Sequence, residues 1–205
     1  IAADNICGLD SHYKGSLGSS VIKLFDMTAA STGLTEKAAQ TAGISYDRIV
    51  LSPSSHAGYY PGAKTMTMKV VYEKETLKLL GAQIVGYDGV DKRIDVLATA
   101  ICAGMKANEL KDLDLAYAPP YSSAKDPVNM AGFMIENIAN GLVKQFHWDE
   151  VADLPRDGSV TLLDTRTANE YAHGHADGFI NIPVDELRER LSEIDRTKPL
   201  YVMCQ

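Results

Sequence analysis

The sequence predicts an α+β domain followed by a smaller α/β domain. Strand-like runs fill much of the chain up to about residue 86, and helical patterns follow them. From about Gln145 strand-like and helical runs alternate instead, which is typical of a parallel α/β sheet. Between the two parts lies 116–127, where three prolines exclude a helix interior or a central strand. We expect this extended segment, which carries Tyr117 and Tyr121, to pack against other residues.

The first part contains short elements with local start and stop signals. A helix over residues 1–6 ends at Cys7-Gly8, and Thr35 caps another short helix that Gly43 ends. Alternating apolar residues in 66–72 predict a strand with one buried face. The expected strands are 21–25, 27–32, 48–52, 66–72 and 82–86.

Two longer helices follow the strands. In 91–104 the apolar residues recur at helical spacing, which predicts that Cys102 lies on the buried face. Asp126 as N-cap and Pro127 at the first helical position begin a helix that runs to Gly141. On that helix 130, 133, 134 and 138 share one apolar side, which we expect to face the core.

Composition excludes several classes of function. With 45% hydrophobic and 23% charged residues, the 205-residue chain is an ordinary globular protein, and no apolar run is long enough to span a membrane. The net charge is −7 without a basic stripe, which argues against nucleic acid as a partner. Three widely spaced cysteines form neither a disulfide framework nor a CxxC pair, as expected in a reducing cytoplasm. Because the chain begins with Ile1, we expect it to be a piece of a longer protein.

The second part places two reactive side chains at strand ends. Strand 160–164 ends in Asp164 and strand 200–204 ends in Cys204, and helices are expected over 167–172 and 184–194. Chemistry in parallel sheets gathers beyond the carboxyl ends of strands. His173 and His175 with one remote thiol are a weak ligand set, so we expect no metal.

Four motifs of the second part resemble the rhodanese family in order and spacing. In that family the cysteine matching Cys204 accepts sulfane sulfur as a persulfide, and the following loop binds the anionic sulfur through backbone N–H groups. The sequence stops at Gln205, before that loop. The resemblance implies that Asp164 and Arg166 brace the site as an ion pair. The motifs are 163–166 (Leu-Asp-Thr-Arg), 170–171 (Glu-Tyr), 174–183 (Gly-His-Ala-Asp-Gly-Phe-Ile-Asn-Ile-Pro) and 201–205 (Tyr-Val-Met-Cys-Gln).

The first part resembles the dimerisation domain of flavin- and pyridine-nucleotide-dependent disulfide reductases, in the branch with a fused rhodanese domain. The resemblance implies an α+β dimerisation domain, an antiparallel sheet with helices, followed by an incomplete α/β rhodanese-like domain. The implied boundaries are 1–17 for the end of a flavin-domain helix, 18–143 for dimerisation, and 144–205 for the truncated rhodanese-like part. The residues that carry the resemblance are 18–25, 30–34, 56–62, 81–86, 91–95 and 117–121.

The resemblance also implies a site shared between two subunits of a homodimer. Tyr59 and Tyr117 would reach the sulfur chemistry of the partner, with Tyr60 and Tyr121 as neighbouring candidates for substrate binding. His56 is a further candidate, as an acid, a base or a satisfied loop histidine. A phenol can donate a hydrogen bond to a developing thiolate.

The intact protein would use FAD, NAD(P)H and coenzyme A, yet this sequence contains no G-x-G-x-x-G fingerprint. Neither Cys7 nor Cys102 matches the family's redox cysteine, so the fragment alone is expected to reduce nothing. The leading hypothesis is therefore part of a reductase of coenzyme A disulfide, coenzyme A persulfide or polysulfide, with NADH or NADPH as reductant. The alternatives are a non-catalytic dimerisation or interaction module and a stand-alone sulfurtransferase.

Overall fold

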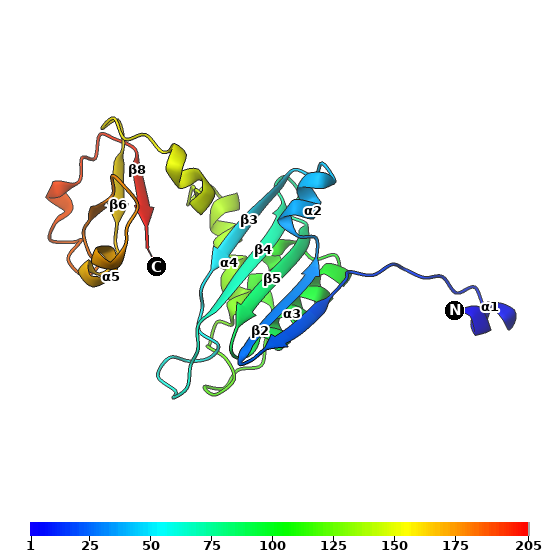
Figure 1. The fold of residues 1–205 in the computed structure, drawn as a ribbon. Helices are drawn as coiled ribbons and strands as arrows, with labels where there is room; N and C mark the ends of the chain where they lie inside the picture. Colours follow the sequence, from blue (N-terminus) through cyan, green and yellow to red (C-terminus); the bar gives the residue numbers. More distant parts are fainter. Residues whose placement is uncertain (205) are drawn as a thin grey trace. The chain divides into compact units, whose positions relative to one another are not determined.

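The structure is a computed structural model that describes residues 1–204. It divides into two compact units, residues 1–144 and the part that begins at Gln145 (Figure 1). Each unit has its own sheet. None of the helices in residues 1–204 is both long enough and apolar enough to cross a membrane.

A five-stranded sheet forms the centre of the first unit, and every neighbouring pair of strands is antiparallel. This confirms the predicted antiparallel sheet. Strand β4 buries Met66, Met68 and Val70 on one face, as its alternation predicts. In sheet order the strands are β1 (Ser20–Leu24), β2 (Met27–Gly33), β5 (Leu79–Gly86), β4 (Met66–Glu73) and β3 (Tyr46–Leu51).

Helices α3 (Val90–Cys102) and α4 (Pro127–Ala139) cover one face of this sheet (Figure 1). The main hydrophobic core lies between them and the strands. Helix α2 (Glu36–Thr41) packs Ala39 against Val71 and Leu80 in a second, smaller cluster. The remaining elements of this unit are α1 (Ala2–Ile6) and the 3-10 helix η1 (Ala107–Asp112).

The predicted start of α4 is confirmed in detail. The Asp126 side chain accepts a hydrogen bond from the Val128 amide, Pro127 occupies the first turn, and the Asn129 side chain accepts one from the Asp126 amide. Asn129 also donates to the carbonyls of Leu110 and Leu113 at 3.0 Å each. The capping residues therefore fix the start of α4 and also hold the end of η1, where segment 113–126 begins.

The prediction that Cys102 is buried is wrong, because its side chain is exposed. The buried face of α3 instead comprises Val90, Arg93, Ile94, Leu97 and Ala100. Each step of four residues turns about 40° around a helix, so Cys102 lies roughly 80° away from Ile94. Residues spaced three apart, such as Ile94, Leu97 and Ala100, remain on the buried side of α3 instead.

The predicted apolar side of α4 is also partly wrong. Met130 is exposed, whereas Val128, Ala131 and Ile135 are fully buried. The helix rests on η1 through Gly132, and this contact turns the buried face away from Met130. Phe133 is half-buried, with the Lys125 ammonium 5.2 Å from its ring centroid.

The second unit holds a short parallel sheet in the order β7-β6-β8, which confirms the predicted α/β part. Its strands are β6 (Thr161–Asp164), β7 (Ile180–Asn181) and β8 (Leu200–Met203), and its helices are η2 (Trp148–Asp153), α5 (Ala168–His173) and η3 (Leu191–Glu193). The predicted helix over 184–194 is wrong: turns and η3 occupy this stretch. None of its residues is buried, so it lacks the packing that stabilises a short helix.

Candidate functional site

The fold brings two predicted site residues into direct contact. The hydroxyl oxygens of Tyr59 and Tyr117 lie 2.9 Å apart, within hydrogen-bonding distance. Tyr59 comes from the loop between β3 and β4, and Tyr117 from the segment between η1 and α4. Both side chains are exposed, 77% and 46% respectively, so the pair is accessible on the surface of the unit.

The two segments that carry these tyrosines are joined by their backbones. The Ala57 amide donates to the Ser122 carbonyl at 3.0 Å, two residues before Tyr59. The segment 113–126 therefore packs against the β3–β4 loop, as its aromatic and proline-rich composition predicts. It is not extended throughout, because the amides of Tyr121 and Ser122 both donate to the Ala118 carbonyl and close a turn. The backbone bond between Ala57 and Ser122 places both phenol groups on the same side of the unit.

A buried ion pair lies beneath this junction. Arg93 of α3 is 1% exposed and its Nη2 lies 2.9 Å from Asp126 Oδ2. Burial works to raise the pKa of Asp126, but hydrogen bonds from Ser122, the Val128 amide and Arg93, with the Arg93 charge, outweigh it and lower the pKa below its ordinary value. The carboxylate is therefore ionised near neutral pH.

Hydrogen bonding also affects Tyr117 itself. The bond to the Tyr59 hydroxyl, with a smaller effect of desolvation, raises the pKa of the Tyr117 phenol above its ordinary value. The phenol therefore keeps its proton throughout the neutral range. A protonated phenol is a hydrogen-bond donor, which is the form needed to stabilise a thiolate.

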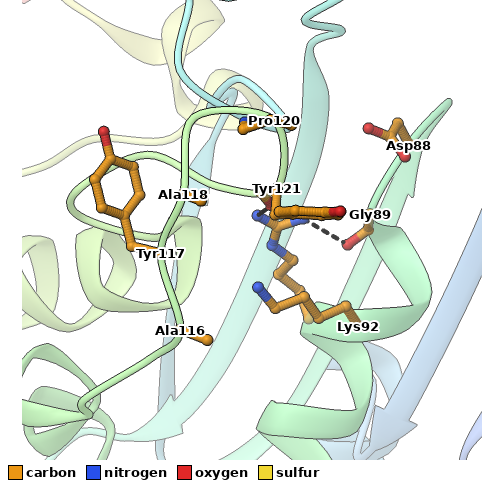
Figure 2. A pocket seen from close by; sticks show the side chains of 9 residues that line it. Asp88, Gly89, Lys92, Ala116, Tyr117, Ala118, Pro120 and Tyr121 are labelled. Atoms are coloured by element: carbon orange, nitrogen blue, oxygen red, sulfur yellow. Dashed lines mark hydrogen bonds between the residues drawn. The ribbon is translucent and has the colours of Figure 1, made fainter.

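A pocket of about 460 Å³ opens beside Tyr117 (Figure 2). It lies between the start of α3 and the segment that contains Tyr117 and Tyr121, and Lys92 from α3 lies at its side. Its size is that of a small-molecule site. The lining residues are Asp88, Gly89, Lys92, Arg93, Ala116, Tyr117, Ala118, Pro120 and Tyr121.

The other predicted residues differ in exposure. Tyr121 is 71% exposed on the pocket wall, and Tyr60 is 43% exposed. His56 is buried, with its Nδ1 3.2 Å from the Ala57 carbonyl and its ring edge-on to Tyr60 at 5.8 Å between centroids. His56 thus contacts its own loop, whereas the tyrosines face solvent.

Cys204 follows β8 in the second unit and is exposed. Strand β8 pairs in parallel with β6, with Met203 opposite Asp164, so Cys204 and Asp164 lie at the same edge of the sheet. The Thr165 amide and hydroxyl both donate to the Met203 carbonyl, at 2.9 and 3.0 Å. These two hydrogen bonds therefore hold the end of β8, next to Cys204, against the residue that follows β6.

Asp164 and Arg166 form the ion pair that the rhodanese resemblance implies. Asp164 is fully buried, and Arg166 donates to it from Nε at 3.1 Å and from Nη2 at 2.6 Å. Burial would raise the pKa of Asp164, but hydrogen bonds from the Arg166 side chain and amide outweigh burial and lower it. The bond to Asp164 raises the pKa of Arg166, and negative charge at Cys204 adds to this effect. Asp164 therefore holds the Arg166 guanidinium at the same end of the sheet as Cys204.

The chain contains no G-x-G-x-x-G fingerprint for a dinucleotide cofactor. The turn from β5 into α3 has glycines at both ends, and Arg93 lies against the second of them, Gly89. A Cβ added at Gly89 would meet Arg93 Nη1 at 1.9 Å. Within residues 1–204 there is also no group of three or more His, Cys, Asp or Glu side chains arranged to hold a metal ion.

The family model for the dimerisation domain of pyridine nucleotide-disulphide oxidoreductases matches residues 19–128, more than half of the chain. The chain belongs to this oxidoreductase family. A rhodanese-like domain model matches residues 147–205 of the same chain.

Relatives of this chain include a coenzyme A disulfide reductase of Staphylococcus epidermidis, 41% identical over 134 residues, covering 65% of this chain and 30% of the relative. The reduced Bacillus anthracis CoADR-RHD crystal structure is 50% identical with a TM-score of 0.92, covering 99% of this chain and 36% of that one. An NAD-dependent persulfide reductase from A. fulgidus is 40% identical with a TM-score of 0.85, covering 98% and 36%. The chain thus spans about a third of each of these proteins.

Sequence reasoning missed Arg93 and Ser122, both of which are buried at this site. A signal for Arg93 was present, since it falls within the apolar stripe formed by Val90, Ile94 and Leu97. A charged residue in such a stripe is buried only with a partner. Ser122 carried no comparable signal.

Proposed function

We propose that this chain is the dimerisation and rhodanese-like portion of a flavin-dependent oxidoreductase that uses NAD(P)H to reduce coenzyme A disulfide, coenzyme A persulfide or a polysulfide. The contact between the hydroxyls of Tyr59 and Tyr117 carries this proposal. Two exposed phenols from distant segments have no structural need to meet at the surface. The similarity to reductases of coenzyme A disulfide and of persulfide supports a sulfur substrate.

The two phenols act as hydrogen-bond donors toward the sulfur that leaves. When a disulfide or persulfide bond breaks, one sulfur takes up the bonding electron pair and becomes a thiolate. The Tyr117 phenol is protonated at neutral pH and can donate to this thiolate. Tyr59 holds the Tyr117 hydroxyl in place and completes the pair.

The substrate site is completed by a second copy of the protein. The tyrosine pair is exposed, and this chain carries no G-x-G-x-x-G fingerprint for a dinucleotide, so we expect the cofactors to bind elsewhere in the assembly. A homodimer through the first unit places the phenols of one subunit at the reactive centre of the other. The edge strand β1, with Val21, Ile22 and Leu24 exposed, supplies apolar surface for such an interface.

Cys204 handles sulfane sulfur. Its thiolate attacks the outer sulfur of a persulfide, a new S–S bond forms at Cys204, and the old S–S bond breaks with its electron pair leaving on the donor thiolate. Arg166, held by Asp164, supplies positive charge close to the reacting sulfur. Such thiol chemistry suits a reducing compartment such as the cytoplasm.

Replacing Tyr117 in the intact enzyme tests the proposal. Tyr117→Phe removes the hydrogen-bond donor but keeps the aromatic ring. Turnover with the sulfur substrate should fall, because the transition state loses about 1–3 kcal/mol of stabilisation. NAD(P)H oxidation with an artificial dye acceptor bypasses the sulfur substrate and should be unchanged. Equal losses in both reactions, or a loss in neither, would contradict the role of the phenol.

A further inference from the structure

Arg93 is a buried cation that the proposed chemistry does not itself use. Its guanidinium lies within the first unit, with Asp126 as its ion-pair partner at 2.9 Å. Nε also donates to Asp126 at 3.2 Å, and Nη2 shares its two N–H groups between Asp126, the Ser55 carbonyl at 2.8 Å and the Tyr121 carbonyl at 3.3 Å. The third nitrogen, Nη1, donates to the Gly89 carbonyl at 3.1 Å.

These acceptors belong to the two segments that carry the phenols. Ser55 lies four residues before Tyr59, and Tyr121 lies four residues after Tyr117. A guanidinium offers several N–H donors in one rigid plane, so it fixes the directions of its acceptors as well as their distances. Arg93 therefore joins α3 to both segments through hydrogen bonds of defined geometry.

Asp126 holds the guanidinium in this orientation. Its Oδ2 accepts from Arg93 Nη2 and, at 2.7 Å, from the hydroxyl of the buried Ser122. Its Oδ1 caps α4 by accepting from the Val128 amide at 3.0 Å. The carboxylate is thus anchored to a helix, and Arg93 is anchored to the carboxylate.

We propose that Arg93 is a positioning residue that holds the two tyrosine-bearing segments so that the hydroxyls of Tyr59 and Tyr117 meet. Lysine cannot replace it, because a single ammonium cannot reach Asp126 and the carbonyls of both segments in one plane. The effect on turnover rests on the proposed function, whereas the positioning itself does not.

The first test measures the phenol contact directly, without activity. In the 205-residue chain labelled with 13Cζ-tyrosine, NMR titration follows the Tyr117 phenol, whose signal is assigned by its loss in Tyr117→Phe. Tyr59→Phe breaks the contact and should lower the pKa of Tyr117 toward its ordinary value. Arg93→Lys should give the same result as Tyr59→Phe. The proposal is overturned if Tyr117 titrates in Arg93→Lys as in the wild type, or if Tyr59→Phe has no effect.

The matched control is Arg48→Lys. Arg48 is also largely buried and ion-paired, with Glu36, and this pair bridges β3 and α2. It should leave the Tyr117 titration unchanged. If it shifts the titration as Arg93→Lys does, the effect is general loosening of the domain, and the positioning role is refuted.

The second test is a double-mutant cycle in the intact enzyme. Tyr117→Phe and Arg93→Lys should each lower turnover with the sulfur substrate about 10- to 100-fold. The turnover of the double variant should lie within about twofold of that of Tyr117→Phe alone. Losses that multiply would show that Arg93 acts separately from the phenol pair. If Tyr117→Phe alone costs nothing, the proposed function fails, while the NMR titration still decides the positioning.

Should Arg93→Lys not fold, Asp126→Asn replaces it in both tests. Asparagine is an equally good N-cap, so α4 keeps its start while the guanidinium loses the charge that orients it. The shift in the Tyr117 titration should be in the same direction and smaller. A wild-type titration in folded Asp126→Asn would overturn the proposal.

Discussion

Gly132 of α4 lies directly against the backbone of Lys111 in η1. A Cβ added at Gly132 would meet the Lys111 amide nitrogen at 2.2 Å and the Leu110 carbonyl carbon at 2.9 Å. The two elements can approach this closely only because the residue has no side chain. The contact sets the distance from α4 to η1, and these two elements flank the segment that carries Tyr117.

Gly132→Ala should therefore destabilise the first unit by about 1–3 kcal/mol, the usual cost of overpacking. The glycine has ordinary helical backbone angles, so only the clash opposes the better helix propensity of alanine. Thermal unfolding followed by circular dichroism measures the effect. Gly58→Ala is the control, since a Cβ there meets no atom within 4 Å. Equal stability of the two variants would mean that η1 moves away without cost.

Acid should weaken the second unit through Asp164. Its folded-state pKa is lowered, so its ion pair stabilises the fold fully above its unfolded pKa of about 4, and this contribution is lost as pH falls through the folded pKa. At pH 7, Asp164→Asn should lower the free energy of opening of β6 by about 1.5–3 kcal/mol, as measured by hydrogen exchange. The difference from wild type should shrink below about pH 4.

The control for this pH dependence is Asp177→Asn, an exposed carboxylate of the same unit. It should change the protection of β6 by less than about 0.5 kcal/mol at pH 7. If Asp164→Asn lowers the free energy of opening of β6 by the same amount at pH 7 and at pH 3, packing, and not the charge of Asp164, stabilises the strand.

The chain should dimerise through the first unit, and β1 should contribute. Placing two charges on one face of this strand, as Ile22→Lys with Leu24→Lys, should raise the dissociation constant at least about tenfold, equivalent to 1.4 kcal/mol. Sedimentation equilibrium measures this constant. Val50→Lys, at an exposed apolar position on the opposite edge strand β3, should leave it unchanged. A monomer at micromolar concentration would contradict a site shared between subunits.

Cys204 should carry the sulfane sulfur of the second unit. Cys204→Ser in the intact protein should abolish persulfide labelling of this unit and leave reduction of a simple disulfide largely unchanged. Mass spectrometry after incubation with coenzyme A persulfide detects the label. Cys102→Ser, which removes an exposed thiol of the first unit, should preserve labelling at Cys204.

The charge of the second unit should also restrict its sulfur donors. Residues 145–205 carry 12 acidic and 6 basic side chains, and this field repels free anions such as thiosulfate most strongly at low salt. We expect coenzyme A persulfide, or sulfur handed over within the protein, to be the better donor. Efficient thiosulfate sulfurtransferase activity at low salt would contradict this expectation.

Elements whose signals are local could be predicted from the residues alone. The Asp126-Pro127 cap, the Thr35 cap and the alternation in 66–72 each act within a few residues, and the structure has them where they were predicted. The alternation of strands and helices in the second part likewise predicted its parallel sheet, whereas the antiparallel sheet of the first part was implied by the family resemblance. Residue types at fixed spacing were enough for these conclusions, because capping and alternation need no distant partner.

Which faces are buried, and which distant residues meet, depends instead on the packing of the whole chain. Cys102 is exposed, and the predicted helix over 184–194 is absent, because burial depends on what the rest of the chain packs against an element. The contact between Tyr59 and Tyr117 joins loops 58 residues apart, and Arg93 is buried beneath it among carbonyls from three segments. No local pattern encodes such a contact, since it exists only once the sheet and helices have brought these segments together.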